Sequence, residues 1–299
     1  MSGELHISLD VHAGRIAPRL IAPEDLPIGR LLQGRSSVEA AHTLPHIFSL
    51  CPNAQRLAAQ MTLSLPPETR TRPALAREIR RDHLLRLFVF WPAQLGLTSR
   101  PLPADVHLGT ALAGPSGRLP TPSEFDLWLE RGAGTAPLFA RLAETFAPGQ
   151  AVANLPLPRD PLHETAVENS TAARQCHAPL MKMAEARYGR GPLWRALARL
   201  VELFACLNGS LPAQPRLSNG IAVVPAARGA YAMSARVENG RVVAFARRTP
   251  TNHLLAPGGA LEQALASLPA HKAQFARLVV DIMDPCVPVR LQDQEAGNA

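Results

Sequence analysis

Alternating apolar and polar positions predict two separate β-regions in this chain. Near the start, Leu5, Ile7 and Leu9 alternate with polar residues, and a similar run returns over residues 16–21 after a turn. Late in the chain, two alternating runs are joined by Asn239-Gly240, a dipeptide typical of hairpin turns. Strands are expected there over residues 221–224, 231–237 and 242–247. The two regions predict small antiparallel sheets or hairpins.

Apolar residues at helical spacing predict that helices form most of the core. Pro52 suits the first turn of a helix that ends near residue 65, and Leu75, Ile79 and Leu84 keep helical spacing over residues 74–90. Further helices are expected over residues 124–131, 137–146, 166–207 with a break near 189–192, 261–268 and 273–283, and a short helix should end before Gly34. Residues 99–122 and 148–163 predict loops because they are rich in proline or glycine, and the polar residues 291–299 predict a mobile tail. The fold class is therefore expected to be α+β.

Composition narrows the class of protein. The 299 residues suffice for one large domain or two small ones, and a hydrophobic content of 46% can supply a substantial core. The 29 prolines argue against a coiled coil or a simple up-down bundle, because proline interrupts long helices.

The basic charge balance does not by itself indicate a nucleic-acid partner. The formal net charge is +7, but no basic run is longer than Arg80-Arg81 or Arg247-Arg248. Aromatic residues make up only 5% of the chain, which argues against an interface built on stacked bases. A solvated basic surface is the better interpretation, and we expect no nucleic-acid partner.

Leader and membrane signals are weak. The start of the chain has neither a basic leader nor an apolar segment, so we expect no signal peptide. The most apolar window, residues 84–97, contains Arg86 and Pro92 and is shorter than the ~20 residues of a membrane-spanning helix. The four cysteines form no CxxC pair, so we expect reduced thiols, a cytoplasmic protein and no membrane span.

Two of the cysteines stand where a metal ligand or nucleophile is plausible on chemical grounds. Cys51 precedes Pro52 at a predicted helix N-terminus, where unpaired N–H groups and the helix dipole are expected to lower the pKa of a thiol. The alternative is an ordinary buried thiol. Cys286 follows an apolar helix within Asp284-Pro285-Cys286, where Asp284 can orient a neighbouring group. That tripeptide alone is weak evidence.

The remaining candidate residues can also be explained by packing or surface roles alone. Arg228, between two predicted strands, can bind an anion through its guanidinium or form a surface salt bridge. Cys206 lies in an apolar stretch and is expected to pack in the core, and Cys176-His177 favours packing or surface exposure over metal binding. No phosphate-binding loop, dinucleotide fingerprint, zinc constellation or nucleophile elbow is present. From the residues alone, the function stays open.

Seven short motifs, taken together and in order, resemble the large subunit of nickel–iron hydrogenases. They are Leu32-Gln33-Gly34-Arg35, residues 46–52, Asp82-His83-Leu84-Leu85, residues 168–174, Ala227-Arg228-Gly229, Pro250-Thr251 and Asp284-Pro285-Cys286. Each motif is weak alone, but they span nearly the whole chain. The resemblance implies a shortened version of the large-subunit fold, as a single domain over residues 1–299.

The departures from that family are as informative as the matches. In the enzymes four thiolates hold nickel and two of them bridge to iron, whereas this chain keeps only Cys51 and Cys286 of the four. The other two cysteine positions hold Phe48 and Val289, and the histidines that follow each motif are replaced by Gln55 and Gln292. The proton-relay glutamate of the enzymes aligns loosely with Ser2. Two thiolates cannot form a four-sulfur nickel site, so we expect no nickel and no enzymatic activity.

This combination is similar to hydrogenase assembly proteins of the HupK/HoxV type. The resemblance implies that Cys51, with Cys286 as a candidate second ligand, transiently holds iron with its cyanide and carbonyl ligands, while Arg228 and Thr251 bind the cyanide. It also implies two partners, the maturation chaperone complex that delivers iron and the apo large subunit of a hydrogenase. The alternatives are a metal-free mimic of the large subunit that binds a chaperone, and a redox enzyme with an unusual site.

Overall fold

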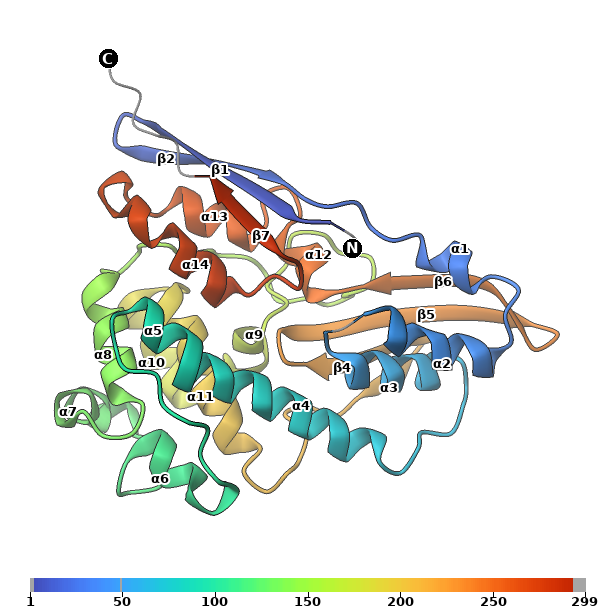
Figure 1. The fold of residues 1–299 in the computed structure, drawn as a ribbon, viewed down its shortest axis with the longest axis horizontal. Coiled ribbons are helices and arrows are strands. Elements are labelled where there is room, and N and C mark those ends of the chain that lie inside the picture. Colours follow the sequence, from blue (N-terminus) through green and yellow to red (C-terminus); the bar gives the residue numbers. More distant parts are fainter. Residues whose placement is uncertain (1–2, 49, 293–299) are drawn as a thin grey trace.

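The chain folds as an α+β protein in a computed structural model, as the sequence predicts. The structure describes residues 3–48 and 50–292, so Ser2 and residues 293–299 of the predicted tail lie outside the described residues. Two small sheets lie apart from each other, and helices pack against both (Figure 1). The described side chains form two main hydrophobic clusters, one around each sheet.

The first sheet joins the two ends of the chain. It has the order β2-β1-β7, with β1 at Leu5–His12, β2 at Arg15–Ile21 and β7 at Val289–Gln292. β1 and β2 form the predicted antiparallel hairpin, and β7 runs parallel to β1. Leu5, Ile7 and Leu9 are buried, because their side chains all point to the same face of the strand.

Strand β7 corrects the prediction of a mobile tail over residues 291–299. Leu291 and Gln292 pair with Ile7 and Ser8, so the ordered structure continues past the predicted boundary. The polar composition of this segment concealed the strand, which is held by main-chain hydrogen bonds along the edge of β1. This pairing begins only three residues after Cys286 and therefore anchors the C-terminal motif beside the N-terminal hairpin.

The second sheet is antiparallel and carries the predicted Asn-Gly hairpin. Its strands, in the spatial order β3-β4-β5-β6, are β3 Arg216–Ser218, β4 Ile221–Ala226, β5 Gly229–Glu238 and β6 Arg241–Arg248. Asn239 and Gly240 both have positive φ values, 49° and 73°, as a two-residue turn of this type requires. The preceding turn, between β4 and β5, contains Ala227 and Arg228.

The N-terminal helices cover this second sheet. They are α1 Ile28–Leu32, α2 Ser37–Ile47, α3 Pro52–Thr62 and α4 Thr71–Leu85, and α3 packs on β4 and β5 (Figure 1). Helix α2 was not predicted, although its start carries a capping box in which Ser36 and Glu39 satisfy each other's backbone N–H groups. A π-helical turn at Arg86–Phe90 continues α4 into α5, Trp91–Gln94.

The second, larger cluster of helices surrounds α11. Its members are α6 Leu108–Ala113, α7 Phe125–Arg131, α8 Ala136–Thr145, α9 Thr171–Gln175, α10 Pro179–Tyr188, α11 Pro192–Ala205, α12 Pro250–Leu254, α13 Ala260–Ala266 and α14 Ala276–Met283. Short 3₁₀ turns occur at Asp105–His107, Pro122–Glu124 and Ala270–Phe275. The prediction of a loop over residues 99–122 is wrong for α6, because the buried side chains of Leu108 and Leu112 hold one short helix within the proline-rich segment.

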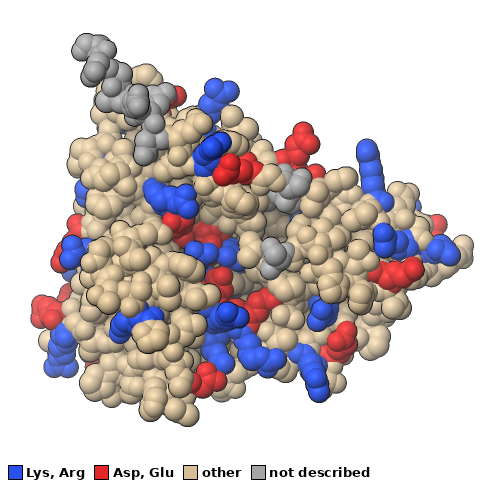
Figure 2. Space-filling view, viewed as in Figure 1, with Lys and Arg blue, Asp and Glu red and all other residues tan. Residues whose placement is uncertain are grey.

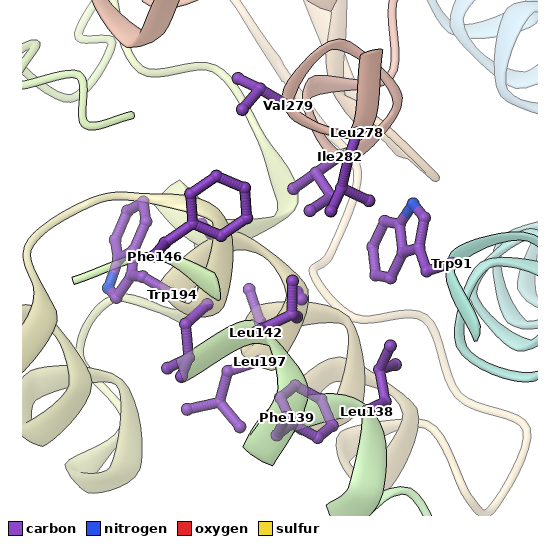
Figure 3. Close-up of a cluster of buried hydrophobic side chains, with 14 of the residues drawn as sticks. Trp91, Leu138, Phe139, Leu142, Phe146, Trp194, Leu197, Leu278, Val279 and Ile282 are labelled. Carbon is purple, nitrogen blue, oxygen red and sulfur yellow. The ribbon is translucent and has the colours of Figure 1, made fainter. Parts of the chain in front are cut away.

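Aromatic and aliphatic side chains from α11 and three other helices meet in one core. Figure 3 shows Trp91 from α5, Phe139 from α8, Trp194 from α11 and Ile282 from α14 around one common core. Two buried arginines and a buried glutamate also lie on α11, at Arg195, Arg199 and Glu202. Since α14 leads directly into Asp284, this core fixes the position of the C-terminal motif.

Acidic and basic side chains are intermixed on the face of the molecule drawn in Figure 2. Within residues 3–48 and 50–292, no helix combines the length and the apolar character that a bilayer crossing needs.

Candidate functional site

The four residues predicted for the site are connected through Arg228. One guanidinium nitrogen, Nη1, donates to the Cys51 thiol at 3.7 Å, and Nε lies 2.9 Å from Oδ1 of Asp284. Two residues further on, the backbone N–H of Cys286 donates to the hydroxyl of Thr251 at 2.9 Å. The structure therefore brings together side chains that are separated by up to 235 positions in the sequence.

Cys51 is placed by an uncommon backbone conformation. It precedes α3 as the N-cap residue with a left-handed φ of 53°, and Pro52 occupies the first helical position. Its carbonyl accepts the N–H of Gln55 at 3.1 Å, so the helix begins directly behind the cysteine. The side chain is buried, with 5% of the residue exposed. The thiol also packs in the hydrophobic cluster around the second sheet.

The C-terminal motif turns in a similar way. Asp284 ends α14 with a left-handed φ of 57°, and its N–H donates to the carbonyl of Val280. Pro285 and the half-buried Cys286 follow before β7 begins. Thr251, almost fully buried in the first turn of α12, then caps this segment by accepting the Cys286 N–H.

Buried carboxylates and guanidinium groups form a network around Arg228. Arg228 pairs with Asp82 and Asp284, and Arg199 bridges the same two carboxylates at 2.8 and 2.7 Å. Arg86 adds a third guanidinium, 2.7 Å from Asp284. Burial alone would raise the pKa of Asp82, but Arg199 and Arg228 lower it to about 2. Two carboxylates thus face three guanidinium groups in this network.

A further layer of charged residues holds the β4–β5 turn that carries Arg228. Arg174 donates to the turn carbonyls of Ala226 and Gly229, and it pairs with Glu202 at 2.6 Å. His83 contacts the same glutamate at 3.0 Å, and its pKa is lowered because the ring is fully buried. These contacts fix the backbone on both sides of Arg228.

Gly229 leaves no room for a side chain beside Arg228. Its φ of 152° is rare for other residues, and a Cβ atom there would lie 2.3 Å from the carbonyl oxygen of Asn169. Asn169 also brackets the start of β5, because its side-chain amide exchanges hydrogen bonds with the backbone of Ala230. The glycine is therefore required for the close approach of these two segments.

The predicted lowering of the Cys51 pKa is wrong for this structure. Burial is the largest influence and raises the pKa of the thiol well above its usual value, and the nearby Cys286 raises it further. Arg228 acts in the opposite direction but does not compensate. Desolvation raises the pKa by more than the helix N-terminus lowers it. The thiol is therefore protonated at neutral pH until a metal ion displaces the proton.

Arg228 lines three cavities, and the site residues are distributed among them. A cavity of about 780 Å³ is bordered by Cys51, one of about 440 Å³ by Cys286, and a small chamber of about 20 Å³ by Thr251. Leu50 lines both larger cavities. The structure therefore gathers the four residues around one guanidinium, but it does not place the two thiols in a single cavity.

The donor set suits a metal unit that brings ligands of its own. Within the part of the chain that the structure describes, no cluster of three or more His, Cys, Asp or Glu side chains is arranged to hold a metal ion. Cys51 and Cys286 supply at most two thiolates. The other two cysteines border none of the three cavities that Arg228 lines: Cys176 packs in the larger hydrophobic cluster, and Cys206 is buried at the end of α11.

Several residues of the site were not assigned a role from the sequence. Asp82 belongs to one of the seven motifs, but its pairing with Arg228 depends on tertiary structure. Arg199 had one available signal, since Arg195, Arg199 and Glu202 recur at helical spacing in an otherwise apolar helix. Nothing in the sequence around Arg86 distinguishes it from an exposed arginine.

Comparisons with known proteins agree with the motifs. No family model matches the chain. The hydrogenase expression/formation protein HupK of Rhodobacter capsulatus is 50% identical over 299 residues, which cover 98% of this chain and 99% of that protein. HupK of Bradyrhizobium diazoefficiens is 26% identical and covers 99% of this chain and 98% of its own length. HoxV of Cupriavidus necator is 33% identical, over 26% of this chain.

Solved structures share the fold. The nickel–iron–selenium hydrogenase of Desulfovibrio vulgaris Hildenborough superposes with a TM-score of 0.60 over 93% of this chain and 94% of that chain, at 14% identity. An NAD⁺-reducing nickel–iron hydrogenase gives a TM-score of 0.56 over 92% of this chain and 93% of that chain, at 16% identity. The predicted similarity to the large-subunit fold of nickel–iron hydrogenases is confirmed.

Proposed function

The chain belongs to the HupK family of hydrogenase expression/formation proteins, and from this premise we propose that it is an accessory scaffold in nickel–iron hydrogenase maturation. In this proposal it transiently holds iron with its cyanide and carbonyl ligands through Cys51, with Cys286 as a second ligand. Its partners are the chaperone complex that delivers the iron and the apo large subunit that receives it, in the cytoplasm.

The contact between Arg228 and Cys51 is the observation that carries this proposal. A guanidinium beside a metal-binding thiolate stabilises the anionic thiolate and can donate to a cyanide bound on the same iron. Without iron, burial raises the pKa of the thiol and keeps it neutral. Iron therefore binds with release of a proton, and protonation of the thiol favours release of the cargo.

The low number of thiolates suits a carrier better than an enzyme. A closed four-sulfur site retains nickel, whereas Phe48 and Val289 leave this chain with two of the four sulfurs. Iron that already has cyanide and carbonyl ligands needs few protein donors. We therefore propose that the protein holds no nickel and does not turn over hydrogen.

One observation favours a second candidate function, a metal-free mimic of the large subunit that binds a maturation chaperone. Cys51 and Cys286 border different cavities, with Arg228 between them. In that case the hydrogenase-like fold would supply the surface for the chaperone, and Cys51 would contact it without holding iron. The two candidates make opposite predictions for the iron content of the protein.

Iron content and transfer separate the two candidates. We expect the wild-type protein, isolated without oxygen from cells that express the maturation machinery, to contain iron and to activate apo large subunit on mixing. Cys51→Ser should lose most of the iron and abolish activation. Cys206→Ser is the matched control, because both cysteines are 5% exposed but Cys206 borders none of the three cavities that Arg228 lines. If the wild-type protein contains no iron but still binds the chaperone, the scaffold function is refuted and the metal-free mimic is supported.

A further inference from the structure

The cavity beside Cys286 is lined by three arginines, of which one, Arg247, has no ion pair among the described residues. Its volume is about 440 Å³, and three of the described residues that border it are Arg86, Arg228 and Arg247. No aspartate or glutamate is among the described lining residues. Arg86 and Arg228 are paired with carboxylates behind the cavity wall, at Asp284 and Asp82.

Arg247 differs from the other two arginines because it has no carboxylate partner. Among residues 3–48 and 50–292, it makes a hydrogen bond from Nη1 to Oε1 of Gln55, at 2.7 Å, and no ion pair within 4 Å. The exposed carboxylate of Asp25, which accepts from Asn252, acts on Arg247 only from a longer distance. The Arg247 guanidinium lies over the ring of Phe48, 3.9 Å from the centroid. The neutral amide and the ring hold the guanidinium in place without neutralising it. A largely buried cation of this kind favours an anion as its counterpart.

Both residues that hold Arg247 stand at positions where this chain departs from the hydrogenase motifs. Phe48 occupies a cysteine position, and Gln55 a histidine position. Each of them contacts the same guanidinium. The two departures that the motif resemblance marks are therefore linked in space through Arg247.

We propose that the cavity bordered by Cys286 and Arg247 is a binding site for a small, weakly hydrated anion of the cyanide class. Arg247 is its positioning residue, and its free N–H groups donate to the nitrogen end of the anion. The assignment of that anion to a cyanide carried on iron rests on the proposed function. The anion site itself rests only on the three arginines, the two residues that hold Arg247 and the lack of carboxylates in the described lining.

Titration of the metal-free protein with thiocyanate, followed by calorimetry, tests the anion site without any iron. Wild-type protein should bind thiocyanate saturably, and Arg247→Gln should weaken binding about tenfold or more, because a charged hydrogen bond is lost. Arg248→Gln is the matched control: this neighbour on β6 donates to the carbonyl of Leu162 and does not line the cavity, so binding should be unchanged.

Gln55→Glu gives a second test that keeps Arg247 in place. The new carboxylate would replace the amide oxygen that already accepts from Nη1, pair with the guanidinium and weaken thiocyanate binding to a similar extent. If the wild type shows no saturable binding, or if Arg247→Gln and Gln55→Glu both bind like the wild type, the anion site is refuted. These results do not depend on whether the protein ever carries iron.

The iron-loaded protein tests the identity of the anion. If a cyanide on iron occupies the cavity, Arg247→Gln should shift a cyanide stretching band, and Arg248→Gln should leave it in place. Unmoved bands in Arg247→Gln would refute this assignment even where thiocyanate binding is lost. Absence of iron from the wild type would instead refute the proposed function and leave the thiocyanate result standing.

Discussion

At the scale of single residues, Thr251 links the proposed cyanide contact to the shape of the C-terminal motif. Its hydroxyl oxygen accepts the N–H of Cys286, which leaves the hydroxyl proton available to a second acceptor. The residue borders only the chamber of about 20 Å³, which has room for about one water-sized group. Thr251 therefore acts first on the position of Cys286.

Replacing Thr251 separates the hydroxyl from the volume of the side chain. Thr251→Val should leave the Cys286 N–H without its acceptor and lower the free energy of unfolding by about 1–3 kcal/mol. It should also weaken iron retention, whereas Thr251→Ser should keep most of both. Urea unfolding and iron analysis of the two variants check this, and a Thr251→Val protein as stable as Thr251→Ser would contradict it.

The sequence predicted the residues of the site unevenly. Cys51, Arg228, Thr251 and Cys286 were identified because each lies in a short motif, and the structure places the four residues close to Arg228. The direction of the Cys51 pKa was not predictable, since it depends on burial by segments far away in the chain.

The environment of Arg247 was also not predictable from the sequence. In the sequence it is half of a basic dipeptide, indistinguishable in kind from its neighbour Arg248. Only the strand geometry separates the two, because one side chain reaches Phe48 and Gln55 while the other reaches Leu162. Alternation along a strand is predictable, but which face meets a cavity is decided by tertiary packing.

At the scale of elements, the β4–β5 turn is held by its neighbours on both sides. Gly229→Ala should force Asn169 away from the turn, because no Cβ fits at this position, and should lower the free energy of unfolding by about 1–3 kcal/mol or more. Since Arg228 is adjacent, the variant should also lose iron. Gly240→Ala is the matched control: its φ is also positive, but its Cβ would meet no atom within 4 Å.

Urea unfolding and iron analysis of the two glycine variants measure both effects. Equal loss of stability with unaffected iron retention in Gly229→Ala would show that the turn does not position Arg228.

The contacts between α4, α9 and α11 predict a dependence of stability on acid. Burial would raise the pKa of Glu202, but Arg174 and His83 lower it to about 2, below the value of 4.5 for a free glutamate. A lowered pKa stabilises the folded state above about pH 4.5, and this contribution is lost as the pH falls toward 2. The difference corresponds to roughly 3 kcal/mol.

Unfolding free energies measured between pH 7 and pH 3 test this linkage. Glu202→Gln should be destabilised at pH 7, and its stability should fall less steeply than that of the wild type below pH 4.5. Parallel curves for the two proteins would show that Glu202 does not carry this acid sensitivity.

Helices and strands were predicted correctly where local sequence signals are strong, and they were missed where tertiary contacts determine the structure. The Asn239-Gly240 hairpin is confirmed because its turn requires two positive φ values that this dipeptide tolerates. Helix α6 and strand β7 were missed. The first is short and lies among prolines, and the second is stabilised by pairing with β1 at the other end of the chain.

At the scale of the whole molecule, two hydrophobic clusters meet at the charged network. The larger cluster contains Trp91, Trp128 and Trp194, and the cluster around the second sheet contains no tryptophan among its described members. The prediction that residues 1–299 form one domain can therefore be tested spectroscopically. Tryptophan fluorescence reports on one cluster, while circular dichroism reports on both.

A single domain should give coincident urea transitions in fluorescence and circular dichroism, because the ion pairs around Arg199 and Arg228 couple the two clusters. A circular-dichroism transition with a second step that fluorescence does not follow would indicate that the region around the second sheet unfolds on its own.

The central claim is that a hydrogenase-like fold retains an iron unit with its cyanide and carbonyl ligands after losing two of the sulfurs that hold nickel. The infrared spectrum of the anaerobically isolated protein tests it most directly. The account predicts stretching bands of bound cyanide and carbonyl in the wild type, their loss in Cys51→Ser and their retention in Cys206→Ser. A wild-type spectrum without such bands, from protein that still supports hydrogenase maturation, would contradict it.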